Sequence, residues 1–260
     1  MKLGGVMKVA KGAWYIIPRY NDWLYKRRRS GGMEAERDIL NRLLTRPERV
    51  RTNTFSASGA GQCLRRRQLA YLGYPQARPE ARTMNIFANG DYVHLRHQVA
   101  GIEEGYLLDA EVSVANEEYN LTGTMDGELD SEGIAEFKSI NDRGFSDVSM
   151  YGVKTEHSEQ VHSYMLASGR DHARVLYENK NTQDLKEFLV KRDERIIRKV
   201  REDLVVLNDA TQAKTLYPMQ GECTEGKGAF RTCPFKEICP LATFASQGRS
   251  IRIRSSSASD

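Results

Sequence analysis

The sequence predicts an α/β fold in which helices flank a central mixed β-sheet. The 260 residues are enough for one substantial hydrophobic core with small appended subdomains. Helical and strand patterns follow one another in the order helix, three strands, helix, strand. A hydrophobic content of 40% and a negative mean hydropathy are typical of a soluble globular protein. No apolar run reaches membrane-spanning length, so we expect no membrane partner.

Residues 1–54 are expected to form a basic N-terminal extension. Residues 1–70 hold 16 Lys and Arg against 5 Asp and Glu, although the net charge of the whole chain is only +4. The runs Lys26–Arg29 and Arg65–Arg67 suit a polyanion such as DNA, and the alternative is a solvated surface. Within the extension, Trp14–Ile17 indicates a short strand or a packed loop. Met33–Arg46 has the apolar spacing of a helix.

Two helices open the main domain, which we place at residues 55–218. The first carries Cys63 and the three arginines that follow it. The second runs from Thr83 to about Ala100, with His94 and His97 on one side. A histidine on an apolar helix face is more often a satisfied core residue than a ligand.

The second half of the main domain alternates strands with helices. Strand patterns cover residues 106–115, 119–129, 133–140, 173–178 and 185–191. A loop rich in Asp, Gly and Ser follows the third of these strands. Helices are expected at Thr155–Ser168, ended by Gly169, and at Asp193–Leu216.

The second and third strands form a hairpin that carries the most informative polar residues. Strand side chains alternate faces, so Glu136 and Lys138 point to one side of the sheet and Phe137 to the other. Folding the hairpin about its Asp-Ser-Glu-Gly turn brings Asp126 to within a residue or two of being opposite Glu136. Two carboxylates and an ammonium group then share one small patch.

Such a patch is suited to metal chemistry. Adjacent carboxylates repel each other and need a cation, and oxygen ligands favour Mg²⁺ or Mn²⁺. A lysine beside the metal can orient or help deprotonate a water molecule aimed at a phosphate. The alternative is a solvated strand face, since 28% of the residues are charged and a Glu-x-Lys triplet arises often by accident.

Three of the four cysteines, Cys223, Cys233 and Cys239, lie within residues 219–245, and Cys63 lies far upstream. We see no signal peptide and expect a cytoplasmic chain, in which thiols are more often free or metal-bound than bridged. Tetrahedral thiolates suit Zn²⁺ or an iron–sulfur cluster, and spacing does not decide between them. Unrelated buried thiols are the alternative. Residues 246–260 are expected to be a disordered tail.

Several of these residues occur in the order seen in PD-(D/E)XK nucleases of the RecB type: His94, Asp126, Glu136-Phe137-Lys138, Gln160 and Tyr164. The chain resembles this family over roughly Phe55–Pro240. An early cysteine followed by basic residues, with a C-terminal cysteine trio, resembles the iron–sulfur branch. That branch includes CRISPR-associated RecB-like exonucleases and AddB-type nuclease domains. The nine residues between Cys223 and Cys233 depart from its pattern, in which these two cysteines sit close together.

The resemblance implies a restriction-endonuclease-like core and a role for each matched residue. His94, Asp126 and Glu136 would bind the catalytic metal, Mg²⁺ or Mn²⁺, together with the Phe137 carbonyl. Lys138 would position the attacking water and stabilise charge on the phosphate. The other two matched residues, Gln160 and Tyr164, would orient this lysine or contact the DNA backbone. The four cysteines would hold a structural 4Fe–4S cluster, with Zn²⁺ as the alternative.

The function expected from these features is a metal-dependent DNA nuclease, most simply an exonuclease on DNA ends or single strands. One rival is a non-catalytic DNA-binding protein of the same fold, stabilised by zinc. A second rival is an assembly subunit that cuts only beside a helicase, recombination or integration partner, or as an oligomer. The expected setting is the cytoplasm of a prokaryotic or phage-infected cell.

Overall fold

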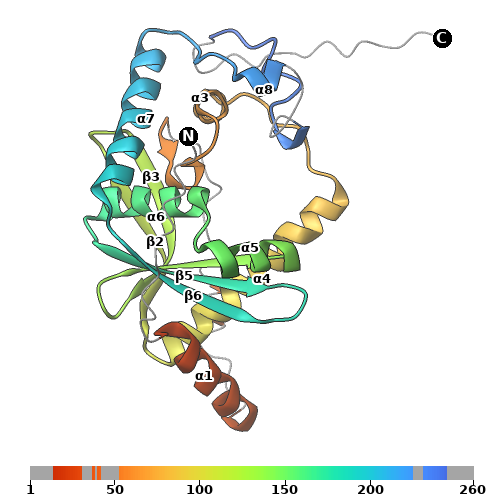
Figure 1. Ribbon diagram of the computed structural model, residues 1–260, viewed down its shortest axis with the longest axis vertical. Helices are drawn as coiled ribbons and strands as arrows, with labels where there is room; N and C mark the ends of the chain where they lie inside the picture. Colours follow the sequence, from red (N-terminus) through yellow and green to blue (C-terminus); the bar gives the residue numbers. More distant parts are fainter. Residues whose placement is uncertain (1–13, 31–36, 39, 42–52, 225–230, 245–260) are drawn as a thin grey trace, which may run out of the picture.

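The protein is built around one six-stranded mixed sheet with helices on both faces (Figure 1). The structure, a computed structural model, describes residues 14–30, 37–38, 40–41, 53–224 and 231–244. The predicted α/β fold is therefore confirmed. Most of the predicted helix at residues 33–46, and the predicted tail, lie outside the described residues. Among the helices that are described, none combines the length and the apolar character needed to cross a membrane.

The described elements are the following. The helices are α1 (Ile16–Ser30), α3 (Leu64–Tyr71), α4 (Ala81–Glu103), α5 (Asp142–Tyr151), α6 (Thr155–Ser168), α7 (Glu194–Gln212) and α8 (Gly221–Thr224), with the 3₁₀ turn η1 (Ala57–Gly59). The strands are β1 (Phe55–Ser56), β2 (Leu107–Asn116), β3 (Leu121–Leu129), β4 (Ile134–Ile140), β5 (His172–Asn179) and β6 (Leu185–Lys191). The predicted strands, the second entry helix and α6 are all present within a few residues of their expected bounds.

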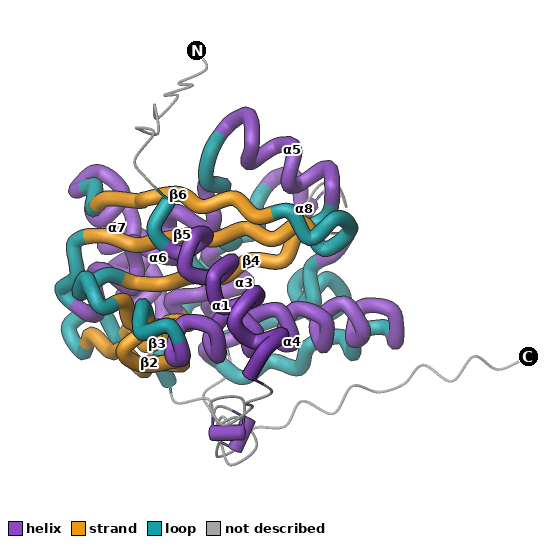
Figure 2. The backbone as a smooth tube through the Cα atoms, turned by 90° about the horizontal axis from the view of Figure 1, so that it is seen from below, coloured by secondary structure: helices purple, strands orange, loops and turns teal. Residues whose placement is uncertain are grey.

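The sheet has the strand order β1-β3-β4-β5-β6, and β2 also pairs with β3 (Figure 2). The β2–β3, β3–β4 and β5–β6 pairs are antiparallel, whereas β1–β3 and β4–β5 are parallel. The parallel β4–β5 pair requires a crossover, which α5 and α6 supply. This crossover places α6 directly over the face of β4.

The hairpin of β3 and β4 is paired only near its turn. Its ladder joins Glu128 to Ile134 and Gly127 to Ala135. One step further would set Asp126 opposite Glu136, as the sequence predicts, but the described ladder stops at that point. Because the two strands part there, side chains can enter the space between them from either face of the sheet.

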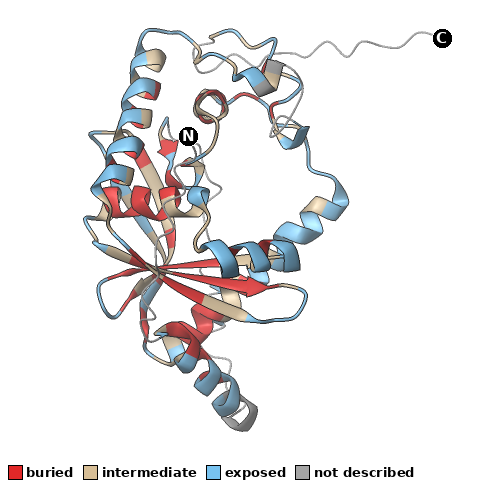
Figure 3. Ribbon diagram, viewed as in Figure 1, coloured by how far each residue is buried: buried red, intermediate tan, exposed pale blue. Residues whose placement is uncertain are grey.

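Each face of the sheet is covered by its own helices (Figures 1 and 3). One core joins the sheet to α6 and α7 through residues such as Met125, Val161 and Leu204. On the other face, Ile16 and Ile17 of α1 pack with Phe137 and its neighbours. Helix α4 completes this second face. Alternate residues of β4 therefore face α6 on one side and α1 and α4 on the other.

Helix α1 replaces the strand or loop expected at Trp14–Ile17. Its first turn is held by the buried carboxylate of Glu187 on β6, which accepts from the N–H groups of Tyr15 (3.0 Å), Ile16 (2.9 Å) and Ile17 (3.2 Å). The N–H groups at a helix start have no partner within the helix, and a carboxylate satisfies them and their partial positive charge. Pro18 is tolerated because it lies in this first turn.

Helix α5 replaces the loop expected after the hairpin. Its segment is rich in Asp, Gly and Ser, which favours a loop in the sequence, but Asn141 supplies a helix start. The Asn141 side chain accepts from Gly144 N at 2.9 Å and so caps the helix. The end of α6 agrees with the prediction, because Gly169 adopts φ 78°, a left-handed conformation suited to glycine.

Candidate active site

The predicted site residues meet where β3 and β4 part. Asp126 comes from β3, Glu136 and Lys138 from β4, His94 from α4 and Gln160 from α6. The two helices lie on opposite faces of the sheet, and His94 contacts Asp126 whereas Gln160 bonds to Glu136. The structure thus brings together all five of these residues.

Asp126 takes over a backbone hydrogen bond that the sheet leaves open. If the ladder continued, Phe137 N–H would pair with the backbone of β3. It donates instead to Asp126 Oδ2 at 2.7 Å. The other carboxylate oxygen lies 3.2 Å from His94 Nδ1. Both oxygens of Asp126 are therefore fixed, one by the backbone of β4 and one by α4.

Lys138, Glu136 and α6 form a continuous hydrogen-bond network. Lys138 Nζ donates to Glu136 Oε1 at 2.5 Å and to Gln160 Oε1 at 3.1 Å. Gln160 Nε2 donates to Glu136 Oε1 at 2.7 Å and to Tyr164 Oη at 3.0 Å. Tyr164 lies close against β3, since a Cβ on Gly123 would be 2.8 Å from its ring. Gln160 thus links the lysine, the glutamate and the tyrosine.

Glu136 is the carboxylate of the site whose negative charge is least favoured by its surroundings. It is 1% exposed, and its Oε2 atom has no hydrogen-bond partner among the described residues. Burial and the nearby charge of Asp126 raise the pKa of Glu136 to about 7, against the opposing effect of Lys138. A buried carboxylate with a bare oxygen gains strongly from any cation placed beside it.

The three charged groups around Glu136 shift one another's pKa values. Burial disfavours a charged imidazole at His94, but the charge and hydrogen bond of Asp126 outweigh it and raise the pKa of His94 to about 9. Burial opposes the ionised form of Asp126 as well, yet His94 and Lys138 lower its pKa. Burial also acts against the ammonium of Lys138, whereas Glu136 and Asp126 raise its pKa. The raised pKa favours the protonated form of Lys138.

The side chains of the site are of the types that bind a hard divalent cation, but they are not placed around a common point. Two carboxylates and an imidazole are suitable ligands for Mg²⁺ or Mn²⁺, and Glu136 Oε2 is a vacant donor. In the described part of the chain, no three His, Cys, Asp or Glu side chains are arranged to hold a metal ion. At this site, His94 pairs with one oxygen of Asp126, and Lys138 pairs with one oxygen of Glu136.

The structure corrects the expectation that Arg65, Arg66 and Arg67 form one DNA-facing surface. Arg65 is 8% exposed and donates to the carbonyls of Tyr217 (2.7 Å) and Cys239 (3.0 Å). Arg67 is 5% exposed. Both guanidinium groups thus face the protein interior, and only Arg66 is partly accessible.

The burial of Gln160 and Tyr164 on α6 bears on the choice between their two expected roles, orienting Lys138 or contacting DNA. Gln160 is 8% exposed and Tyr164 is 3% exposed. Their polar atoms bond to each other, and those of Gln160 also bond to Lys138 and Glu136. This burial favours the orienting role for both residues over contact with a DNA backbone.

Three cysteines gather beside α3. Cys63 immediately precedes this helix, and Cys233 and Cys239 pack with Leu69 in a small C-terminal core. Burial raises the pKa of Cys239, and the nearby Cys233 and Cys63 contribute to the increase. The thiols of these three are not bridged. Cys223 lies on α8, and residues 225–230 of the loop after it are outside the described residues.

Sequence reasoning missed a pair that supports Asp126 from behind. Gln98 of α4 donates to the Asp126 carbonyl at 3.0 Å and to Glu111 Oε1 at 2.8 Å. Glu111 lies on β2 across from Asp126, and its φ of 59° interrupts the pairing there. The one signal in the sequence that could have indicated this pair is the glutamate inside the predicted strand at residues 106–115.

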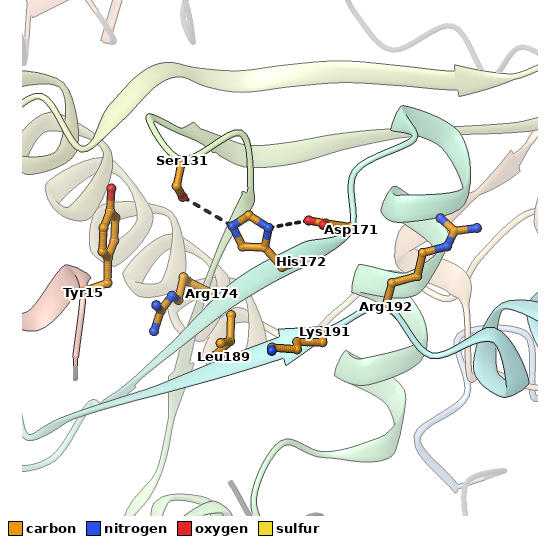
Figure 4. Close-up of a pocket in the computed structure, with 8 residues that line it drawn as sticks. All are labelled: Tyr15, Ser131, Asp171, His172, Arg174, Leu189, Lys191 and Arg192. Carbon is orange, nitrogen blue, oxygen red and sulfur yellow. Dashed lines mark hydrogen bonds and ion pairs between the residues drawn. The ribbon is translucent and has the colours of Figure 1, made fainter. Parts of the chain in front are cut away.

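An open pocket of about 450 Å³ lies apart from this site (Figure 4). It begins at His172 on β5, five residues or about 16 Å along the strand from the partner of Lys138. Several of its polar groups already have partners: His172 contacts Asp171 and Ser131, and Arg174 pairs with Glu187. The pocket is lined by Tyr15, Ser131, Asp171, His172, Arg174, Leu189, Lys191 and Arg192. We assign it no part in the chemistry.

Comparison with solved structures finds chains that share this fold at low sequence identity. An alkaline exonuclease from Laribacter hongkongensis is 15% identical with a TM-score of 0.51, covering 63% of this chain and 90% of its own. The same enzyme in complex with dAMP is 16% identical, with the same TM-score and coverage. The structure of SSO0001 is 19% identical with a TM-score of 0.47, covering 81% of this chain and 97% of its own. No family model matches the chain, and no curated protein matches it.

Proposed function

We propose that this chain is a metal-dependent DNA exonuclease of the RecB-like PD-(D/E)XK type. The observation that carries the proposal is the convergence of Asp126, Glu136, Lys138 and Gln160 where β3 and β4 part. The fold shared with an alkaline exonuclease supports it, and the dAMP held by that enzyme supports DNA as the substrate. The proposed setting is the cytoplasm of a prokaryotic or phage-infected cell.

The proposed metal ligands are Asp126, Glu136, His94 and the carbonyl of Phe137. Mg²⁺ or Mn²⁺ bound there would supply Lewis acidity and a more acidic water. For these side chains to ligate, Glu136 and His94 must give up protons, since their pKa values of about 7 and about 9 allow protonation at neutral pH. The Phe137 N–H keeps one oxygen of Asp126 in place during this change.

The remaining residues act on the phosphate and on the water. Lys138 carries its positive charge at the mouth of the site, where it orients the attacking water and stabilises the charge that develops on the phosphate. Gln160 holds Lys138 at 3.1 Å through its carbonyl oxygen and Glu136 through its amide nitrogen. Tyr164 fixes Gln160 in turn. The protein's share of catalysis is therefore positioning and electrostatic stabilisation.

The proposal includes a 4Fe–4S cluster on Cys63, Cys223, Cys233 and Cys239, with Zn²⁺ as the alternative. The proximity of Cys63 and Cys233 to Cys239, and the packing of Phe235 and Cys239 against Leu69 of α3, support it. Thiolates suit both metals. Such a group would tie the start of the nuclease core at residues 55–218 to the segment that follows it. Partners such as a helicase, a recombinase or a second copy of the chain belong to the same proposal.

The test is a cleavage assay on protein purified without oxygen. End-labelled DNA and DNA with blocked ends are incubated with Mg²⁺ or Mn²⁺, and the reaction is repeated after chelation. We expect release of nucleotides from free ends, no release from blocked ends, and loss of activity with the chelator. Metal-dependent cutting of blocked DNA would replace the exonuclease with an endonuclease. DNA binding without cleavage under any of these conditions would favour the non-catalytic rival.

A further inference from the structure

A buried polar pair lies directly behind the candidate active site. His97 follows His94 by one turn of α4, and its Nε2–H donates to Glu178 Oε2 on β5 at 2.7 Å. The two side chains are 1% and 2% exposed. Arg96 of the same helix also pairs with Glu178. One carboxylate of the sheet is thus held by two consecutive residues of α4.

Burying this polar pair among aromatic rings costs free energy of folding. The ring of His97 lies between Tyr20 (4.5 Å) and Phe137 (5.2 Å). Burying a carboxylate and an imidazole costs free energy, and an apolar pair of similar size is often as stable or more so. Stability therefore gives little reason for a polar pair here. What the pair does supply is a directional bond that fixes α4 along β5.

Phe137 connects this bond to the chemistry. Its ring stacks on His97 at 28° and meets His94 edge-on at 79°. Its N–H holds Asp126 Oδ2, and its carbonyl is one of the proposed metal donors. A shift of α4 along the sheet would move His94 away from Asp126 and release the stack on Phe137. Three of the proposed metal donors depend on this one helix position.

We propose that His97 and Glu178 are positioning residues of the nuclease site, which set α4 and Phe137 for metal binding. This inference rests on the proposed function. It requires that loss of the pair weaken metal binding and turnover without weakening DNA binding. Partners that orient metal ligands from outside typically contribute about 10–100-fold in metal affinity or activity.

Three variants separate positioning from stability. His97→Phe keeps a ring between Tyr20 and Phe137 and removes the bond to Glu178. Glu178→Gln keeps a hydrogen-bond acceptor and removes the charge. The double variant His97→Phe/Glu178→Leu also removes the buried charge, leaving Arg96, which is 35% exposed, to solvent. Gln68→Leu is the control, because Gln68 is a fully buried polar residue of α3 that donates to the Thr215 carbonyl and accepts from Tyr217 N, outside α1, α4 and β4.

The readouts are Mn²⁺ affinity by loss of the free-ion electron paramagnetic resonance signal, kcat, DNA affinity in Ca²⁺, and melting temperature. We expect His97→Phe and the double variant to bind Mn²⁺ at least about 10-fold more weakly, with unchanged DNA affinity. The double variant should recover the melting temperature but not the Mn²⁺ affinity. The Mn²⁺ affinity of Glu178→Gln should lie between that of His97→Phe and that of the unmodified protein. The control should lose melting temperature and keep Mn²⁺ affinity.

Two results would overturn the inference. One is a double variant with the Mn²⁺ affinity and kcat of the unmodified protein, which would leave the pair a purely structural role. The other is a control variant that loses Mn²⁺ affinity as strongly as His97→Phe does. Failure of the proposed function looks different, because the unmodified protein itself would then neither bind Mn²⁺ nor cleave DNA. If His97→Phe does not fold, the double variant and Glu178→Gln still decide the question.

Discussion

Replacing Lys138 by methionine is expected to remove cleavage and leave a folded protein. Methionine keeps most of the length of the side chain and removes the ammonium group that lies 2.5 Å from Glu136 Oε1. Loss of one preorganised group that stabilises the transition state typically lowers kcat by about 10²–10³. KM for DNA should change little, because Lys138 is 19% exposed and serves the phosphate only at the reacting position.

The cost in stability follows from what happens to Glu136. Breaking a buried ion pair costs about 3–5 kcal/mol when the remaining charge stays uncompensated. Glu136 avoids this by taking up a proton, because its pKa is already about 7, and Gln160 continues to donate to it. The cost then falls towards that of one unsatisfied buried group, about 1–3 kcal/mol. The variant should melt at a lower temperature but remain folded.

Lys199→Met is the control for this experiment. Lys199 pairs with Glu159 (3.0 Å) and Asp203 (3.1 Å) on the surface of α7, and it is 53% exposed. Solvent screens the charge of a half-exposed ammonium, so this variant should keep its kcat and lose only about 1 kcal/mol of stability. Both proteins are assayed for nucleotide release from DNA ends and for thermal unfolding. A Lys138→Met protein with the kcat of the control would refute the assigned role of Lys138.

Three further predictions concern pH, the cysteines and the basic run. Burial and neighbouring lysines lower the pKa of His157 to about 3, so stability is fully present above pH ~6.5 and lost as pH falls towards 3, by at most about 5 kcal/mol. His157→Phe should flatten this loss in urea unfolding, and an unchanged acid limb would contradict it. Cys63→Ala and Cys233→Ala should both give colourless anaerobic protein with a lower melting temperature, since a shared cluster closes a loop worth on the order of 4 kcal/mol. Full metal content in Cys63→Ala would exclude a shared site. Arg66→Ala should reduce the salt slope of DNA binding by about 1, whereas Arg65→Ala should lower the melting temperature instead. Equal slopes in Arg66→Ala and the unmodified protein would leave Arg66 merely solvated.

Elements with a strong local pattern could be predicted from the sequence. The bounds of α6 follow from its apolar periodicity and from Gly169 directly after it, and those of β6 follow from its own apolar pattern. These signals are local, since each lies within the element or next to it. Helix α5 was not found in this way, because its Asp, Gly and Ser residues are also typical of a loop and its start depends on the side chain of Asn141. The identity of α1 depended on Glu187, which lies 171 residues further along the chain.

The sequence predicted which residues form the candidate site, but not how the strands and side chains are arranged there. The order of Asp126, Glu136 and Lys138 in a hairpin is visible in the sequence. The parting of β3 and β4 is not, because it depends on which strand pairs stop. The inward turn of Arg65 is equally hidden, since its partners are backbone carbonyls more than 150 residues away, which have no signature in the sequence. Composition shows the charge of a side chain but not which way it points.

The carboxylate of Glu187 also sets an order of events during synthesis. Helix α1 is made early, but the strand that holds its first turn is complete only about 170 residues later, roughly 10–35 s at usual translation rates. Until then the N–H groups of Tyr15, Ile16 and Ile17 lack the carboxylate that satisfies them in the finished protein. The start of α1 is therefore fixed at its final place late, when β6 joins the sheet.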